Sequence, residues 1–156
     1  MILFSPRTET IQAAINVIKA ANLGFRLVKP YEGEFTRDEK QNQMKSETFV
    51  AEVQLAAPFA LVSSQSRPVE KRENRSLTLK HEISVYIGVA NTHNFASQAV
   101  PPILALLEQC AYALVGAKLH PRSSELNLEN DGIFLVKTDQ YNVYEQKYFQ
   151  SERATI

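Results

Sequence analysis

Residues 76–90 read SLTLKHEISVYIGVA, and residues 97–116 read SQAVPPILALLEQCAYALVG. Apolar and polar side chains alternate through the first segment, which predicts a strand with one face in a core and the other in water. The second segment changes to a repeat of about 3.6 residues, which predicts an amphipathic helix. The predicted core positions of the strand are Leu77, Leu79, Ile83, Val85, Ile87 and Val89, and His81 is a polar exception among them. The predicted core positions of the helix are Val100, Ile103, Leu107, Cys110 and Leu114, and Leu104 and Ala111 broaden this stripe. These segments predict a sheet covered by a helix, and they contain no catalytic chemistry.

The remaining patterns extend this pair to a single α+β domain over residues 1–156. A first helix is predicted over residues 7–22, starting at Ser5-Pro6, because serine caps helices and proline is tolerated in the first turn. We expect a mostly antiparallel sheet of four to five strands, with the two main helices packed on one face. Further strands are predicted at 25–28, 59–63, 133–136 (central, because it is apolar on both faces) and 143–149, with a turn at 130–132 and a loose tail at 151–156.

The segment from Ser64 to Arg75 is polar and much longer than a tight hairpin turn. We interpret it as a long charged loop or a hairpin extension. Its basic residues, Arg67, Lys71, Arg72 and Arg75, outnumber its acidic residues, Glu70 and Glu73. They form a candidate surface for a protein neighbour, or they only keep the segment soluble. We favour these two interpretations over nucleic-acid binding, because the segment has no aromatic side chains for stacking.

Composition narrows the classes of function. The 156 residues include 17 basic and 17 acidic side chains, so the net charge is zero, whereas a nucleic-acid-binding domain usually carries a basic excess. Neutrality also makes self-association slightly easier. Cys110 is the sole cysteine, which excludes an intrachain disulfide and a cysteine-based zinc cage. We expect no membrane span and a protein that works in a reducing cytoplasm.

The polar residues suggest no catalytic, cofactor-binding or metal site. His81, His93 and His120 lack the spacing of metal ligands, and the chain contains neither a nucleophile elbow nor a glycine-rich phosphate loop. We expect His81 to be partly buried at the sheet margin, and His93 and His120 to be exposed in loops. Aromatic residues near the C-terminus, including Tyr144 and Tyr148, either form an interface cluster or cover the outer edge of the core, and the sequence leaves both alternatives open.

The order of these elements resembles a known family. An N-terminal helix containing Ile11-Gln12-Ala13-Ala14-Ile15 leads through Leu23-Gly24 to a strand and then to Tyr31-Glu32-Gly33-Glu34-Phe35. The strand Ala57-Pro58-Phe59-Ala60-Leu61-Val62, the charged excursion opening Ser66-Arg67-Pro68-Val69 and the long strand ending Val85-Tyr86-Ile87-Gly88-Val89-Ala90-Asn91 follow. A helix rich in leucine and alanine and two closing strands complete the order. In this arrangement the chain resembles the tail terminator (tail completion) proteins of Mu-like contractile-tailed phages and related prophages.

The resemblance implies a structural role. Members of that family are expected to form a hexameric ring that caps the finished tail tube, stops its polymerisation and presents a surface for joining the head. The implied partners are further copies of the chain, the tube and sheath proteins and the head–tail connector, in the host cytoplasm during assembly and then in the virion tail. No enzyme activity or cofactor is implied, and neither a membrane nor a specific nucleic acid is an expected partner. The alternatives are another neck or minor tail-assembly component, or a small ligand-binding module or enzyme.

Overall fold

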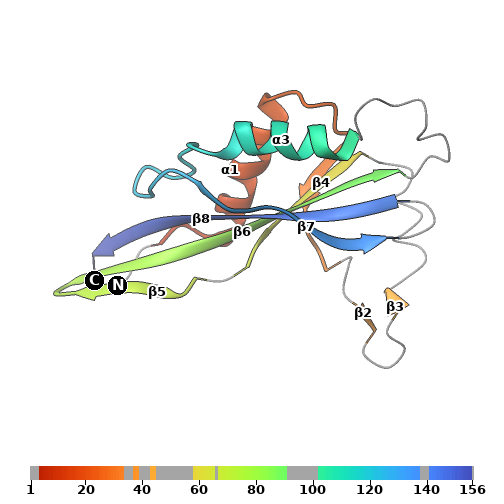
Figure 1. The fold of residues 1–156 in the computed structure, drawn as a ribbon. Helices are drawn as coiled ribbons and strands as arrows, with labels where there is room; N and C mark the ends of the chain where they lie inside the picture. The colour runs from red at the N-terminus through yellow and green to blue at the C-terminus, as the bar shows by residue number, and fades with distance from the viewer. Residues whose placement is uncertain are drawn as a thin grey trace.

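The computed structural model describes residues 4–33, 37–38, 43–44, 58–65, 67–90, 102–137 and 141–155. The helices α1 (Arg7–Ala20) and α3 (Pro102–Leu114) lie over one face of a twisted sheet (Figure 1). In spatial order the sheet contains β1 (Leu27–Pro30), β4 (Phe59–Ser64), β6 (Ser76–Ala90), β8 (Tyr141–Thr155) and β7 (Asn127–Lys137), and β5 (Val69–Glu73) also pairs with β6. The strands β2 (Arg37–Asp38) and β3 (Gln43–Met44) form a separate two-stranded sheet.

This architecture confirms the predicted α+β fold with a mostly antiparallel sheet. Only β1 and β4 run parallel to each other, and the main sheet has six strands among the described residues, slightly more than predicted. The sheet is built on β6 and β8, which pair antiparallel along their whole length, from Ser76 opposite Thr155 to Ala90 opposite Tyr141. Because side chains of paired residues share a face, the two strands together present one face to the helices.

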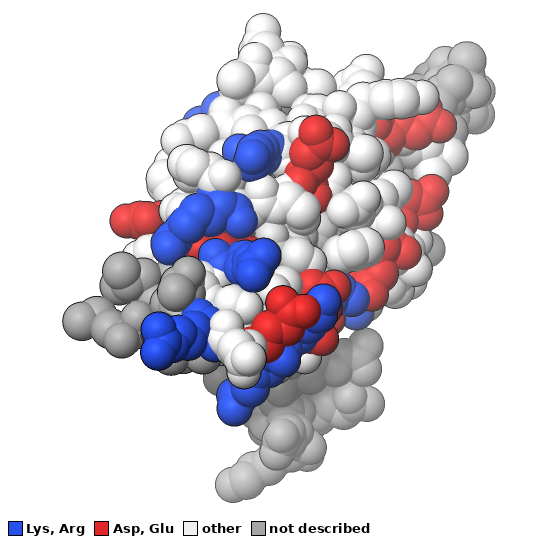
Figure 2. All heavy atoms as spheres, turned by 90° about the vertical axis from the view of Figure 1, so that its left-hand side faces the viewer, with Lys and Arg blue, Asp and Glu red and all other residues white. Residues whose placement is uncertain are grey.

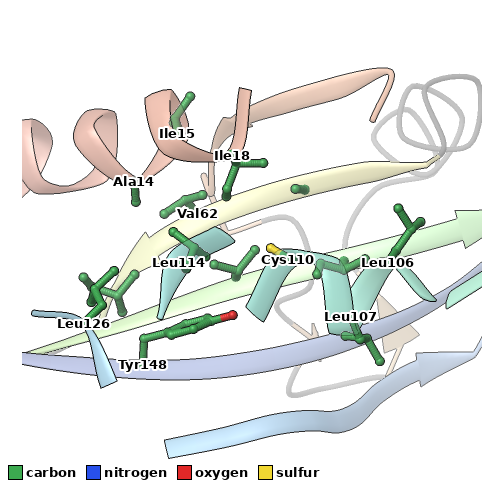
Figure 3. Close-up of a cluster of buried hydrophobic side chains, with 14 of the residues drawn as sticks. Ala14, Ile15, Ile18, Val62, Leu106, Leu107, Cys110, Leu114, Leu126 and Tyr148 are labelled. Carbon is green, nitrogen blue, oxygen red and sulfur yellow. The ribbon is translucent and has the colours of Figure 1, made fainter. Parts of the chain in front are cut away.

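The hydrophobic core lies between that face and the helices (Figure 3). Helix α3 starts within the predicted range 97–116 and buries the predicted stripe from Ile103 to Leu114, together with Leu106. Val100 lies outside the described residues. Cys110 is fully buried, as expected, and burial raises the pKa of its thiol to about 12. The buried members of the core are Ala14, Ile15, Ile18, Ala60, Val62, Ile83, Val85, Ile87, Ile103, Leu106, Leu107, Cys110, Leu114, Leu126 and Tyr148.

The prediction of a wet second face for β6 is wrong over part of the strand. Tyr86 and Ser84 point away from the helices and are nevertheless buried, as are Phe59 and Leu61 of β4. The Tyr31 ring packs against Tyr86, with centroids 4.4 Å apart. The alternation of apolar and polar residues in a strand indicates which side chains can lie in water. Whether a side chain is buried also depends on which other segments pack over it.

Two strand predictions are corrected by the topology. Residues 133–136 belong to β7 at the edge of the sheet, not at its centre, because β8 stands between β6 and β7. The predicted turn at 130–132 is a bulge inside β7, where the Asn130 side-chain oxygen accepts a hydrogen bond from the Gly132 amide at 3.0 Å. A bulge uses the same residue types as a turn, since both need a local departure from extended backbone.

Two further segments, for which the sequence allows a loop or predicts a loose tail, are strands in the structure. Residues 69–73 form β5, which pairs with β6 through a turn at Asn74-Arg75, and Arg75 takes the left-handed conformation with φ of 57°. The alternative of a hairpin extension is therefore the correct one. The predicted loose tail is wrong, because residues 151–155 continue β8 and both Glu152 and Ala154 are buried. Full pairing with β6 supplies the hydrogen bonds that order this end of the chain.

Candidate protein-interaction surface

Helix α3 exposes a second apolar stripe beside the stripe that it buries. Leu104 is 50% exposed, Tyr112 is 84% exposed and Val115 follows at the end of the helix. These positions, with Glu108, recur at intervals of three or four residues, which places them on one side of the helix. The helix is therefore apolar over more of its circumference than the core can cover, and such exposed apolar strips often mark contact surfaces.

The edge strand β7 continues this apolar surface. Leu128 and Phe134 are exposed and pair with Tyr148 and Tyr144, which lie on the helix side of the sheet, whereas the exposed Ile133 pairs with Glu145 and lies on the other face. The Phe134 ring meets the ring of Tyr144 on β8 edge to face, with centroids 5.4 Å apart. Within the described part of the chain, β7 has a strand partner on one side only, which is β8. An edge strand of this kind is a ready template for a contact with another chain.

A groove of about 480 Å³ runs between α3 and β7. Its wall from the helix includes Leu104, Tyr112 and Val115, and the other wall includes Leu128. The charged residues that line it, Glu108 and Asp131, are both acidic, and neither has an ion-pair partner among the described residues. The groove is thus apolar along its walls and negatively charged at two points. We call it the α3–β7 groove.

The β5–β6 hairpin forms a projecting basic element at the other end of the sheet (Figure 1). Lys71 pairs with Glu73 at 2.7 Å, whereas Arg72 and Arg75 have no ion-pair partner among the described residues. Val69, in the same strand, is 53% exposed. The hairpin therefore offers two unneutralised cations and one apolar side chain to a partner.

The structure separates the six residues predicted as interface candidates. Lys71, Arg72 and Arg75 lie exposed on the hairpin, and Tyr144 is partly buried where it lines the groove. Arg67 is partly buried before the hairpin, where one guanidinium nitrogen donates a hydrogen bond to the Ser5 carbonyl at 2.7 Å. The prediction of Tyr148 as an interface residue is wrong: its ring is fully buried under α3, and its hydroxyl donates to the Gln146 side-chain oxygen at 2.7 Å.

Sequence reasoning missed most of the groove. The sequence pattern groups Leu104 with the buried stripe, and it does not identify Tyr112 and Val115, which line the groove. A second stripe at positions 104, 108, 112 and 115 is visible in the sequence, but it merges with the first, because α3 is apolar on nearly every side. Which of two neighbouring stripes faces the sheet is decided by packing, not by periodicity.

A cluster of polar residues is buried beneath the hairpin end of the sheet, around the carboxylate of Glu152. One oxygen of that carboxylate accepts hydrogen bonds from both the backbone amide and the hydroxyl of Ser5, each at 2.8 Å. The other lies 2.7 Å from His81 Nε2. Ser5 therefore donates both of its hydrogen bonds to Glu152 on β8. Its side chain does not cap α1, so the predicted capping role of Ser5 is wrong.

The charges around Glu152 set the ionisation of the cluster. Burial raises the pKa of Glu152, but the two Ser5 donors and the charges of His81 and His120 outweigh it, and the net pKa is lowered. Burial and the charge of Arg67 lower the pKa of His81. The cluster holds a carboxylate between a serine and a histidine, so the histidine does not contact the serine hydroxyl and the Ser–His–Asp order of a nucleophilic triad is not met.

The histidines differ from expectation in their surroundings. His81 is fully buried rather than partly buried at a margin, and His120 is half-buried, with Nδ1 accepting a hydrogen bond from the Arg122 amide at 3.1 Å. His93 lies outside the described residues. In the described ranges, no group of three or more histidine, cysteine, aspartate or glutamate residues is arranged to hold a metal ion. Over the same ranges, no helix has the length and apolarity needed to span a bilayer.

No family model matches the chain, and no curated protein matches it at a significant level.

Proposed function

We propose that this protein is a structural subunit of a contractile phage or prophage tail, a terminator that caps the tail tube as an oligomeric ring. The proposal starts from the order of sequence elements that resembles the tail terminator family. The two helices on a mostly antiparallel sheet are the arrangement which that resemblance implies. In this role the chain ends tube polymerisation and provides the surface to which the head is joined.

The observation that carries the proposal is the α3–β7 groove. An assembly subunit needs apolar surfaces that become buried only in the assembly, and the exposed tyrosine and leucine beside an edge strand provide one. The projecting hairpin supplies a second such surface at the other end of the sheet. A subunit with two separate contact surfaces can bind a neighbour on each side, which is the requirement for a ring.

Two measurements test the proposal together. Sedimentation velocity over a wide range of protein concentration is expected to show a monomer when dilute and a closed oligomer when concentrated. Addition of the protein to purified, uncapped tail tubes of a contractile phage is expected to stop their elongation and to place a ring at one end in electron micrographs. A strict monomer that also leaves tube length unchanged would overturn the proposal.

A hairpin variant sharpens the test on tubes. Replacing Lys71, Arg72 and Arg75 by serine is expected to leave the melting temperature nearly unchanged, because substitutions on an exposed hairpin shift stability by less than about 0.5 kcal/mol. If the hairpin contacts a neighbouring subunit or the tube, the folded variant yields uncapped tubes of irregular length. The wild-type protein in high salt should reproduce this defect, since charge pairs at an interface rim are screened by salt.

A further inference from the structure

We propose that the β5–β6 hairpin of one copy docks into the α3–β7 groove of a second copy. In this contact Val69 enters the apolar part of the groove, and Arg72 and Arg75 meet Glu108 and Asp131. The inference rests on the proposed ring-forming function and names the contact by which neighbouring subunits recognise each other. The occupant of the groove is therefore this same chain and not an unrelated peptide or small molecule.

Charge complementarity is the first argument. The charged side chains that line the groove are acidic and lack ion-pair partners among the described residues. The hairpin carries two arginines, Arg72 and Arg75, that also lack ion-pair partners among these residues. Figure 2 looks onto the hairpin end of the molecule and shows Lys and Arg side chains gathered on one side of it. The net charge of zero is thus compatible with a local basic surface on the hairpin. Opposite charges on two patches of the same protein favour contact between different patches over contact between like patches.

The distribution of side chains on the hairpin is the second argument. Val69 pairs with Leu79, and Arg72 pairs with Leu77, so both residues lie on the same face of the hairpin. Lys71 and Glu73 lie on the opposite face, where they neutralise each other. One face of β5 therefore combines an exposed apolar side chain with an unneutralised cation, and this combination matches a groove with apolar walls and acidic side chains.

The distance between the two surfaces is the third argument. The hairpin pairs with β6 at Ser76–Leu79, whereas β7 pairs with the part of β8 that lies opposite residues 82–89 of β6. The centres of these two places are eight residues apart along β6, or about 26 Å, and β8 stands between β6 and β7. A hairpin therefore cannot fill the groove of its own subunit. Contact between different patches at opposite ends is heterologous, and heterologous contacts close into rings or continue into filaments.

Charge reversal tests the contact by sedimentation velocity. We expect the variant Arg72→Glu/Arg75→Glu and the variant Glu108→Lys/Asp131→Lys each to remain monomeric at concentrations where the wild type associates. An equimolar mixture of the two variants should associate into oligomers that contain them in a 1:1 ratio, because the unchanged groove of the first variant fits the unchanged hairpin of the second and the two reversed surfaces attract each other. The control variant Glu9→Lys/Lys19→Glu changes exposed charges on α1 and should associate like the wild type. Circular dichroism checks that every variant is folded.

Disulfide trapping tests the geometry separately. A mixture of the Val69→Cys variant with the Tyr112→Cys variant should give a cross-linked heterodimer on mild oxidation, while a mixture of Val69→Cys with Gln12→Cys on the exposed side of α1 should not. The native Cys110 is buried and does not interfere. A chain carrying both Val69→Cys and Tyr112→Cys should form a ladder of cross-linked oligomers, as a heterologous contact requires.

The outcomes separate this inference from the proposed function. If the wild type associates and the charge-reversed variants associate equally well, the hairpin–groove contact is wrong and the ring proposal stands on another interface. If the wild type remains monomeric, does not cap tubes and gives no specific cross-link, both proposals are overturned. Recovery of association in the mixture of reversed variants, together with the specific cross-link, supports both.

Discussion

His81 Nε2 and Glu152 Oε2 lie 2.7 Å apart between β6 and β8, and neither side chain is exposed to solvent. The same carboxylate accepts both donors of Ser5, which precedes α1. One buried charge therefore connects the start of the first helix, the middle strand and the end of the last strand. A buried carboxylate is stable only when it is fully paired, so the region should respond strongly to pH and to loss of the carboxylate.

We expect the free energy of unfolding to fall as the pH is lowered. The pKa of His81 in the folded protein is below its ordinary value of 6.5, so the unfolded chain binds a proton first and stability is lost from about pH 6.5 downward. The pKa of Glu152 is also lowered, from an ordinary value of 4.5, and adds a second loss below that pH. Urea unfolding at pH 8, 6.5, 5 and 4 measures the trend. Equal stability at pH 8 and pH 5 would contradict it.

Replacing Glu152 by alanine is expected to destabilise the fold by about 3 kcal/mol or more, because each buried donor left without an acceptor costs about 1–3 kcal/mol. The alanine leaves both Ser5 donors and His81 without their acceptor. Glu152→Gln is the matched control, because it keeps an acceptor for Ser5 but removes the charge. We expect glutamine to lose less stability than alanine and to lack the loss below pH 4.5 that protonation of the carboxylate causes, both measured by urea unfolding.

Leu107 and Leu104 form a matched pair on α3. Leu107 is buried against the core, and Leu107→Ala is expected to destabilise the fold by about 2–5 kcal/mol. Leu104 is half exposed beside the groove, and Leu104→Ala should change the unfolding free energy by less than about 0.5 kcal/mol while weakening self-association. Thermal unfolding and sedimentation separate the two effects. A large loss of stability in Leu104→Ala would place that side chain in the core.

Gly88 on β6 leaves room for the ring of Phe59 on β4. A Cβ atom at Gly88 would lie 2.1 Å from Phe59 Cζ, so Gly88→Ala forces the ring or the strand to move. Overpacking of this kind costs about 1–3 kcal/mol. The double variant Gly88→Ala/Phe59→Leu should be less destabilised than the sum of the two single variants, because the smaller side chain leaves space for the added methyl group. Thermal unfolding of the three variants gives the comparison, and simple additivity would show that the two residues do not compete for space.

Substitutions at Arg67 and Arg72 should distinguish an arginine that stabilises the fold from an arginine that only lies on the surface. Arg67 donates a hydrogen bond to the Ser5 carbonyl and is partly buried, so Arg67→Ser is expected to lower the unfolding free energy by about 1–2 kcal/mol. Arg72 is exposed on the hairpin, so Arg72→Ser should leave stability unchanged. Chemical unfolding of both variants checks this difference. Equal effects would mean that the contact between Arg67 and Ser5 contributes nothing in solution.

The elements with one strong period were predictable from the sequence. The alternation in residues 76–90 and the helical repeat that follows identified β6 and α3, and the lone Cys110 was correctly placed inside. The candidate surface was only partly predictable. The basic hairpin residues are visible as a cluster in the sequence, whereas the groove combines side chains of α3, β7 and β8 that are far apart in the chain.

What the sequence by itself determined is the set of local elements and the α+β class, because periodicity and turn residues act over a few neighbouring positions. The tertiary structure decided the positions of those elements. It placed β7 at the edge and β8 beside β6, ordered residues 151–155 by pairing them, buried Tyr148 and exposed Tyr112. The physical reason is that strand pairing and burial depend on contacts between distant residues, and no local pattern records which distant residue will be the partner.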